Sequence, residues 1–199
     1  MLNKKSKISV IAAVLATLSV ASWFFFGAKK ERKSTENLDY SPMIFKEESA
    51  EKTKTDEESS SLSSQNNKYE NVKYGFSFNY PDDFTVSEFV EEGGKIVLTA
   101  QNAKTGQGLQ IYITAYDDPN FVVSKESILR DVSDMPFLNS ADAVVDGKAK
   151  GAAFFSENES FGKTAEVWFA DGRNFYQATA YRKDVKILEE IIKSWEFRN

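Results

Sequence analysis

The stretch that decides the fold is residues 73–84, which read KYGFSFNYPDDF. Aromatic residues recur at every second position, so in a β-strand their rings share one face; they are Tyr74, Phe76, Phe78 and Tyr80. Pro81 predicts the end of this strand, because proline cannot donate a hydrogen bond to a sheet ladder. The ring face either fills a hydrophobic core or stacks on bases, as the sheet of an RNA-recognition domain does.

Core packing is the better interpretation of the ring face. The RNA-recognition motif places its last aromatic three positions after the preceding one, whereas Phe78 and Tyr80 are two apart. The predicted domain, residues 67–199, carries 15 Lys and Arg against 21 Asp and Glu. A net acidic domain disfavours phosphate binding, so the sequence predicts no nucleic-acid partner.

The rest of the domain is predicted to be rich in β-strands. Alternating patterns follow Pro81 in seven further stretches: Thr85–Val90, Lys95–Asn102, Gly108–Asp117, Ala143–Val145, Ala149–Ser156, Thr164–Ala170 and Asn174–Tyr181. The dipeptides Asp146-Gly147 and Asp171-Gly172 are typical of tight hairpin turns. Because hairpins join antiparallel neighbours, we expect an antiparallel sheet.

Two helices are predicted among these strands. Ser124 is a suitable N-cap for the first, which carries an apolar stripe to about Met135 before Pro136. The second begins near Asp184 and repeats apolar residues at helical spacing as far as Trp195. One apolar stripe on each helix implies packing on a sheet. The expected fold class is therefore α+β, an antiparallel β-sheet flanked by helices.

The order of these elements resembles the PsbP-like domain. The resemblance covers about Val72 to Phe197, and it is carried by the early strand YGFSFNYP, the hairpins, the middle helix, the two Asp-Gly turns and the closing stretch LEEIIKSWEF. It implies a central antiparallel sheet flanked by helices, used as a non-catalytic adaptor beside a membrane complex, as PsbP proteins work on the lumenal side of photosystem II. The metal-linked roles proposed in that family do not carry over, because this chain has no histidine. The chain looks closer to the membrane-anchored bacterial proteins that share the domain.

The amino-acid composition of the chain excludes several classes of chemistry. The 199 residues contain neither cysteine nor histidine. Without cysteine there are no disulfides, thiolate nucleophiles, iron–sulfur clusters or lipid-modified cysteines. Without histidine the commonest general base and transition-metal ligand are missing. The sequence predicts no catalytic, cofactor-binding or metal-binding residue, and no cofactor.

Residues 1–33 predict a membrane anchor. Ile8–Phe26 is a run of 19 residues without a charge, flanked by basic residues on both sides. As a helix it spans about 28 Å, close to the hydrocarbon thickness of a bilayer. The alternative is a signal peptide cleaved after Ala21, where small residues stand at the required positions. Cleavage would leave SWFFF as the new terminus, so we expect an uncleaved single-pass anchor in the lipid bilayer, with the domain outside the cytoplasm.

Residues 34–66 predict a disordered linker. The segment is rich in Ser, Thr, Glu and Lys and includes the run SAEKTKTDEESSSLSSQN. Such a composition cannot bury enough apolar surface to offset the entropy of ordering. As a flexible coil it has a mean reach of about 30 Å. One patch, Tyr40–Phe45 (YSPMIF), is more apolar than its surroundings. It is either a short docking motif or an isolated cluster within the linker.

Short stretches match motifs of penicillin-binding enzymes. Ser160–Lys163 fits S-x-x-K, Lys104–Gly106 fits K-T-G, and Ser133-Asp134 begins an S-D-N-like triplet. Their order along the chain is the reverse of that in the enzymes. The serine of S-x-x-K must also open a helix, whereas Gly162 and the strand after it predict a hairpin. We interpret the matches as chance.

Two acidic pairs offer oxygen ligands for a hard cation. They are Asp82-Asp83 and Asp117-Asp118. Aspartates also form turns and cap helices, and no EF-hand spacing is present, so turn formation is the better interpretation.

The expected function is that of a membrane-anchored, non-enzymatic binding or adaptor domain that docks on a protein partner or an envelope assembly. One alternative is a sensory or small-ligand-binding ectodomain with a cleft between sheet and helix. Another is an envelope hydrolase using a Ser–Lys pair or carboxylates. Convergence of such side chains in a cleft would favour the hydrolase.

Overall fold

The computed structural model describes residues 66–91, 94–116, 118, 121–158, 161–172 and 174–198. The predicted membrane helix Ile8–Phe26 and the predicted linker up to residue 65 lie outside the described residues. Among the helices in the described ranges, none has both the length and the apolar character needed to cross a membrane.

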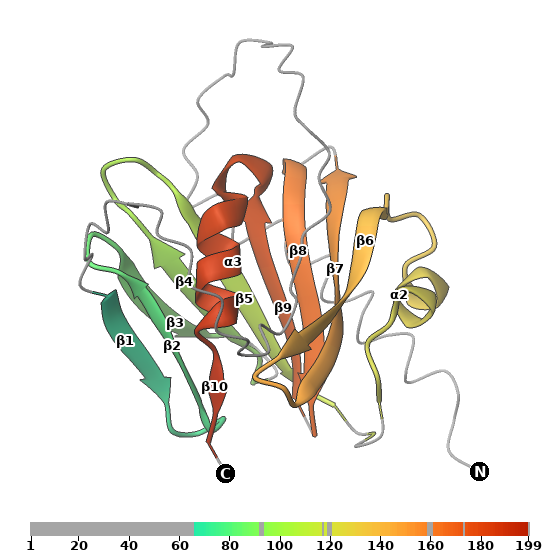
Figure 1. The fold of residues 1–199 in the computed structure, drawn as a ribbon, viewed down its shortest axis with the longest axis horizontal. Coiled ribbons are helices and arrows are strands. Elements are labelled where there is room, and N and C mark those ends of the chain that lie inside the picture. The colour runs from blue at the N-terminus through green and yellow to red at the C-terminus, as the bar shows by residue number, and fades with distance from the viewer. Residues whose placement is uncertain are drawn as a thin grey trace, which may run out of the picture.

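The described residues form two antiparallel sheets with helices beside them (Figure 1). The small sheet has the order β1-β2-β10, with bounds Asn66–Asn71, Phe76–Pro81 and Glu196–Phe197. The large sheet has the order β3-β4-β5-β9-β8-β7-β6. Its strands are β3 Thr85–Val90, β4 Ile96–Gln101, β5 Gly108–Ala115, β6 Leu138–Val145, β7 Ala149–Asn158, β8 Gly162–Asp171 and β9 Asn174–Tyr181. The helices are α2 Lys125–Asp131 and α3 Val185–Lys193, with a 3-10 turn, η1, at Arg182–Asp184. The predicted combination of antiparallel sheet and a few helices is confirmed.

The rings of the KYGFSFNY stretch lie in the main core. Phe76 and Phe78 are 0% exposed, and both stack on Trp195, with ring centroids 4.3 and 5.4 Å away. Tyr74 and Tyr80 are partly buried against the same cluster. This core fills the space between β2, α3 and one face of the large sheet, which we call the front face. The prediction that these rings pack in a core is confirmed.

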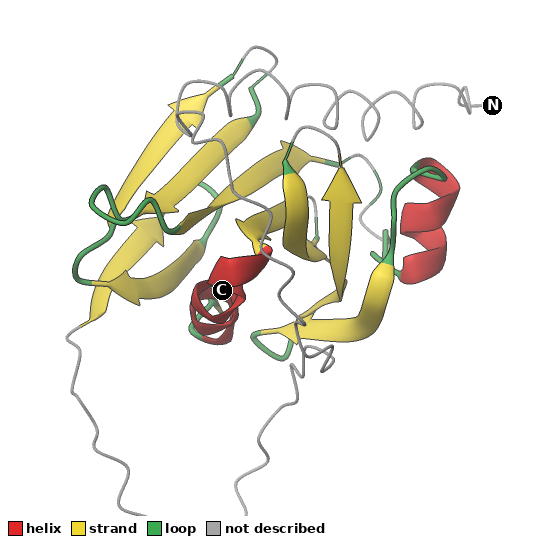
Figure 2. Ribbon diagram, turned by 90° about the horizontal axis from the view of Figure 1, so that it is seen from above, coloured by secondary structure: helices red, strands yellow, loops and turns green. Residues whose placement is uncertain are grey.

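Helix α3 covers the front face of the large sheet, as its amphipathic pattern predicts (Figure 2). Leu188, Ile191 and Ile192 are buried, whereas Lys186 and Lys193 are exposed. The helix ends at Ser194, whose N–H donates to the carbonyl of Glu190. The chain then turns so that Trp195 enters the core. This short connection brings β10 alongside β2.

Helix α2 belongs to a second, smaller core on the opposite face, which we call the back face. Ser124 caps the helix: the Ser127 N–H donates to its hydroxyl at 3.2 Å, and its own N–H donates to the Ser127 hydroxyl at 2.9 Å. The helix ends at Asp131, a turn before the predicted Met135, because Val132 leaves the helical region. Met135 nevertheless packs against this core. The back-face core consists of Val123, Ile128, Ala152, Phe154, Trp168 and Phe175.

Three strands differ from the sequence-based expectation. β2 begins at Phe76, and Tyr74 lies in the preceding turn, because Gly75 takes a φ of 66°. β1 was not predicted, because NNKYEN has no apolar alternation; it forms by pairing at six positions with β2, and Tyr69 packs on Phe78 at a ring distance of 5.1 Å. β6 begins at Leu138, before the predicted Ala143. A register irregularity between Leu138 and Ala141, with Asn139 at a φ of 48°, breaks the period-two pattern there.

Gly151 allows a close approach between β7 and β8. A Cβ at this position would collide with the Trp168 carbonyl oxygen and lie 2.7 Å from the Phe169 Cβ, and neither atom is at the end of a flexible side chain. We expect Gly151→Ala to lower the free energy of unfolding by about 2–3 kcal/mol, since overpacking forces the backbone to move. Chemical denaturation measures the loss.

Gly172→Ala is the matched control for the Gly151 variant. An added Cβ at Gly172 meets nothing within 4 Å, and its cost arises only from the φ of +55°. That conformation costs about 1 kcal/mol for a residue with a side chain. Equal losses in the two variants would contradict the close approach at Gly151.

Candidate functional site

A single row of side chains crosses the back face of the large sheet. Residues paired across antiparallel strands point to the same face. The register joins Phe89 on β3 to Val97 on β4, then Tyr112 on β5, Gln177 on β9 and Trp168 on β8. We call these five residues the back-face row. It places an apolar and aromatic strip across five strands, with one amide within it.

The two halves of the back-face row differ in what packs on them. Trp168 lies in the core beneath α2. Val97 and Tyr112 are only 3% and 1% exposed, yet neither belongs to the two cores that the described side chains form. Figure 2 shows no described helix over the back face of β4 and β5, because α3 lies on the other side and α2 lies beyond β7. The described cores therefore do not account for the burial of Val97 and Tyr112.

Polar atoms in this half of the back-face row lack hydrogen-bond partners. Gln177 is 2% exposed, and among the described residues neither its amide oxygen nor its amide nitrogen has one. The hydroxyls of Tyr112 and of nearby Thr114 are also buried, and no described residue pairs with them. Burial, with the Glu91 carboxylate as a smaller cause, raises the pKa of Tyr112 to about 12. Each unpaired buried group costs about 1–3 kcal/mol, so this combination indicates a site that accepts a hydrogen-bonding occupant.

A buried carboxylate stands next to the back-face row. Glu166 on β8 is 4% exposed and is opposite Thr179 on β9. Its oxygens accept hydrogen bonds from the Thr179 hydroxyl at 2.6 Å, the Thr164 hydroxyl at 2.7 Å and the Trp168 indole at 3.2 Å. Desolvation raises the pKa of Glu166 to about 7, against the opposing effect of these three donors. Glu166 can therefore hold a proton near neutral pH.

Glu166 was not singled out from the sequence, although a signal for it exists. In β8 both faces carry apolar residues, with Ala165 and Val167 on the front face and Trp168 on the back face. A glutamate inside a strand that is apolar on both faces belongs to the middle of a sheet, where it is buried. The sequence gives a weaker indication that Gln177 is buried, since glutamine also occurs on exposed strand faces.

The residues that match penicillin-binding motifs occupy three separate elements. Lys104 and Thr105 lie exposed in the β4–β5 turn, where their N–H groups donate to the Asn102 side chain at 2.9 and 3.2 Å. Ser133 and Asp134 follow α2, and the Ser133 hydroxyl donates to the Asp134 carboxylate at 3.0 Å. Lys163 is exposed at the start of β8, while Ser160 lies outside the described residues. The hydrogen bonds of Lys104, Thr105 and Ser133 are of the kind that stabilises turns.

The predicted acidic pairs are also part of turns where the structure describes them. The Asp83 carboxylate accepts a hydrogen bond of 2.5 Å from the Asn102 amide, which joins the β2–β3 turn to the β4–β5 turn. The Asp118 carbonyl accepts from the Phe121 N–H at 3.0 Å, and Asp117 lies outside the described residues. Within the described ranges, no three His, Cys, Asp or Glu side chains are grouped so as to hold a metal ion.

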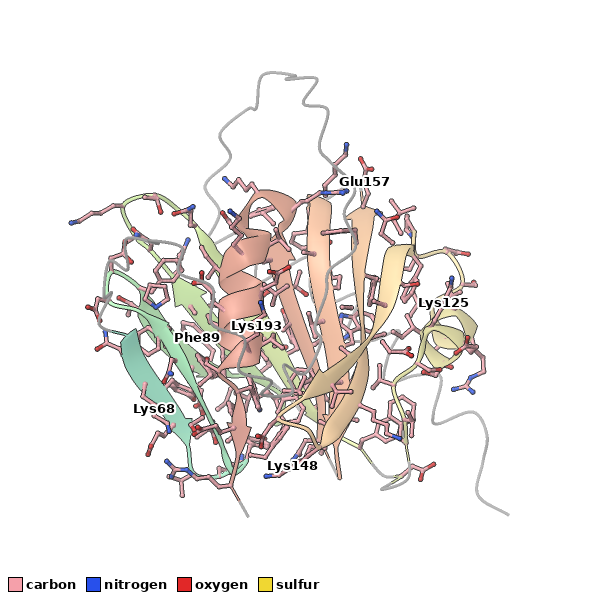
Figure 3. The ribbon with its side chains drawn as sticks, in the orientation of Figure 1. Lys68, Phe89, Lys125, Lys148, Glu157 and Lys193 are labelled. Atoms are coloured by element: carbon pink, nitrogen blue, oxygen red, sulfur yellow. The ribbon has the colours of Figure 1, made fainter. Side chains whose placement is uncertain are left out.

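Exposed apolar side chains gather on the two edge strands of the large sheet. They are Phe89 and Val90 on β3, and Leu138 and Val144 on β6. Figure 3 shows Phe89 on the β3 side of the sheet, far from α2. Edge strands present unpaired main-chain groups, and exposed apolar side chains there favour association with another chain.

Comparison with known proteins yields a likeness of fold. No family model matches the chain, and no curated protein matches it. Among solved structures, the chain is similar to cyanobacterial PsbP (CyanoP) from Synechocystis sp. PCC 6803, with 11% sequence identity and a TM-score of 0.48. The match covers 67% of this chain and 93% of that chain.

Proposed function

We propose that this chain is a membrane-anchored, non-catalytic binding domain that docks on a protein partner at the membrane surface. The observation that carries the proposal is the exposed apolar character of both edges of the large sheet. Four of the six exposed large hydrophobic side chains in the described residues lie on β3 and β6. A partner strand that adds to such an edge gains main-chain hydrogen bonds and apolar contacts together.

The buried carboxylate supports a structural role rather than a catalytic one. The two oxygens of Glu166 accept from three donors, and those donors are two threonines and a tryptophan. A general acid must reach a substrate atom, whereas Glu166 is enclosed by its own sheet. The Glu166 carboxylate is thus a buried polar group whose hydrogen bonds are all made within the protein.

The membrane part of the proposal rests on the amino-terminal sequence. The uncharged run Ile8–Phe26 with basic flanks supports an uncleaved anchor that places the domain outside the cytoplasm. A linker of 33 residues gives the domain a reach of about 30 Å from that anchor. Partners embedded in the same membrane then meet the domain at a raised effective concentration.

We expect Val144→Glu in the full chain to lower crosslinking to its partner in the native membrane by about tenfold, because the charge would be buried at the β6 edge. The measurement is chemical crosslinking in membranes, followed by mass spectrometry of the product. Lys193→Glu is the control, since Lys193 is exposed on α3 and belongs to neither edge strand. An unchanged yield with Val144→Glu would contradict docking through this edge.

The results of two further experiments would overturn the proposal. Intact-mass analysis of the membrane fraction checks the anchor, and a chain that begins at Ser22 would refute it. A purified full chain that turned over an envelope substrate would refute the non-catalytic role.

A further inference from the structure

The part of the back-face row formed by Val97, Tyr112 and Gln177 has the properties of an occupied site. Val97 and Tyr112 are buried outside both described cores, and the Gln177 amide has no partner within the part of the chain that the structure describes. An occupant must therefore supply apolar side chains over Val97 and the Tyr112 ring. It must also supply a donor and an acceptor to Gln177.

The requirement for a donor and an acceptor selects an extended segment over a helix. In a helix the main-chain groups are already paired with each other, so they cannot satisfy Gln177. In an extended segment the N–H and C=O groups are free to pair with an amide. The occupant is thus an uncharged, extended stretch with several apolar side chains.

One stretch of this chain has that chemistry, and we propose that Tyr40–Phe45 (YSPMIF) docks on the back-face row of its own domain. It carries no charge and has apolar side chains at Tyr40, Met43, Ile44 and Phe45. Pro42 opposes helix formation and holds the preceding residue extended. Six extended residues span about 20 Å, and the distance from β3 to β9 is about 14 Å, three strand spacings.

The chain enters the domain at the correct end of the large sheet for this contact. Glu88 shares the front face with Leu98, so the segment passes round the β3 edge to reach the back face. It reaches the described part at Asn66, the first residue of β1. β1 is joined to β3 through Glu88, whose carboxylate accepts from the Tyr69 hydroxyl at 2.7 Å and the Asn71 amide at 3.1 Å. β3 is the end of the large sheet where the back-face row begins. The 20 residues between Phe45 and Asn66 reach about 25 Å as a coil.

Docking of this segment would shorten the tether. Only residues 34–39 would separate the anchor from the docked segment, and six residues span at most about 20 Å. The domain would then be held beside the membrane surface. This consequence depends on the proposed anchor, whereas the contact between Tyr40–Phe45 and the domain does not.

The first experiment measures access to the back face in the full chain. Thr99→Cys places a thiol on β4, on the same face as Val97 and one pair along the strand. It is the sole thiol, because the chain has no cysteine. We expect Ile44→Ser with Phe45→Ser to speed maleimide labelling of this thiol about tenfold, since opening exposes the face. Unchanged labelling would refute the proposal.

The control for the labelling experiment replaces two apolar residues of the predicted linker that lie outside Tyr40–Phe45. Leu38→Ser with Leu62→Ser removes two apolar side chains and leaves Tyr40–Phe45 intact. We expect its labelling rate to change by less than about twofold. A rise equal to that of the Ile44 and Phe45 variant would show a general effect of the linker and refute the contact.

The second experiment tests the contact directly by disulfide formation. In the full chain, Ser41→Cys with Thr99→Cys is expected to oxidise to an intrachain disulfide, whereas Ser41→Cys with Lys193→Cys is not, because Lys193 is on α3 at the front face. A disulfide-linked dimer would assign the face to a second copy. Efficient pairing of Val14→Cys with Thr99→Cys would assign it to the 8–26 stretch. Either result overturns the proposal.

Discussion

Replacing Phe76 by alanine is expected to lower the free energy of unfolding by about 3–5 kcal/mol. The ring is fully buried and is surrounded by others: Trp195 is stacked on it at 4.3 Å, and Tyr176 meets it edge-on at 5.7 Å. Removing it leaves a cavity between β2, α3 and β9 that rigid aromatic neighbours cannot fill. A domain of this size has about 5–15 kcal/mol in total, so the variant is close to unfolding.

Urea denaturation of the full chain, followed by tryptophan fluorescence, measures this loss. Val72→Ala is the control, because Val72 is exposed in the turn before β2 and its truncation costs less than about 0.5 kcal/mol. A loss below about 1 kcal/mol for Phe76→Ala would mean that the ring is not packed as described. It would also reopen the possibility of a binding role for the aromatic strand.

Glu166→Gln is expected to remove a pH dependence of stability. The pKa of Glu166 is about 7 in the folded protein, against 4.5 for an unperturbed glutamate. Between these values the folded state holds a proton that the unfolded state has lost. The contribution of Glu166 to stability therefore falls as the pH rises from about 4.5 to about 7, by about 3 kcal/mol in total.

The glutamine variant should lose this slope, since it resembles the protonated acid at every pH. Its oxygen can accept from Trp168 and Thr179, while its NH₂ group donates to the rotatable hydroxyl of Thr164. At pH 8 the variant is expected to be more stable than wild type by about 3 kcal/mol, and near pH 4.5 nearly equal. Denaturation at both pH values tests this.

Glu190→Gln is the matched control for the pH experiment, because Glu190 is exposed on α3. It should leave the slope between pH 5 and 8 unchanged. A Glu166→Gln protein with the wild-type slope would mean that another group holds the proton.

The large sheet was predictable because most of its strands carry their own pattern. Thr85–Val90 and Asn174–Tyr181 begin and end where the alternation and turn residues indicate. The turn at Asp146 and Gly147 also follows from local chemistry, with φ angles of 51° and 62°. In such segments, local preference and the final packing agree.

The small sheet could not be predicted in full, because β1 depends on contacts distant in sequence. NNKYEN has one ring, and that ring gains its burial from Phe76 and Phe78 only when the strands pair. The back-face row was hidden for a similar reason. Phe89 and Gln177 are 88 positions apart in the sequence and meet only through the register of β3, β4, β5 and β9.

The position of β1 determines how the domain responds to tension. A pull that reaches the domain through Asn66 and runs along β1 loads all six of its pairs with β2 in shear. Ion pairs from Lys68 to Glu196 and from Arg198 to Glu70 fasten β1 to the carboxyl-terminal strand region as well. Bonds loaded in shear share the force and fail together. β1 thus acts as a mechanical clamp. A force on the chain is transmitted through β1 and β2 to the aromatic core before another part of the domain is pulled off.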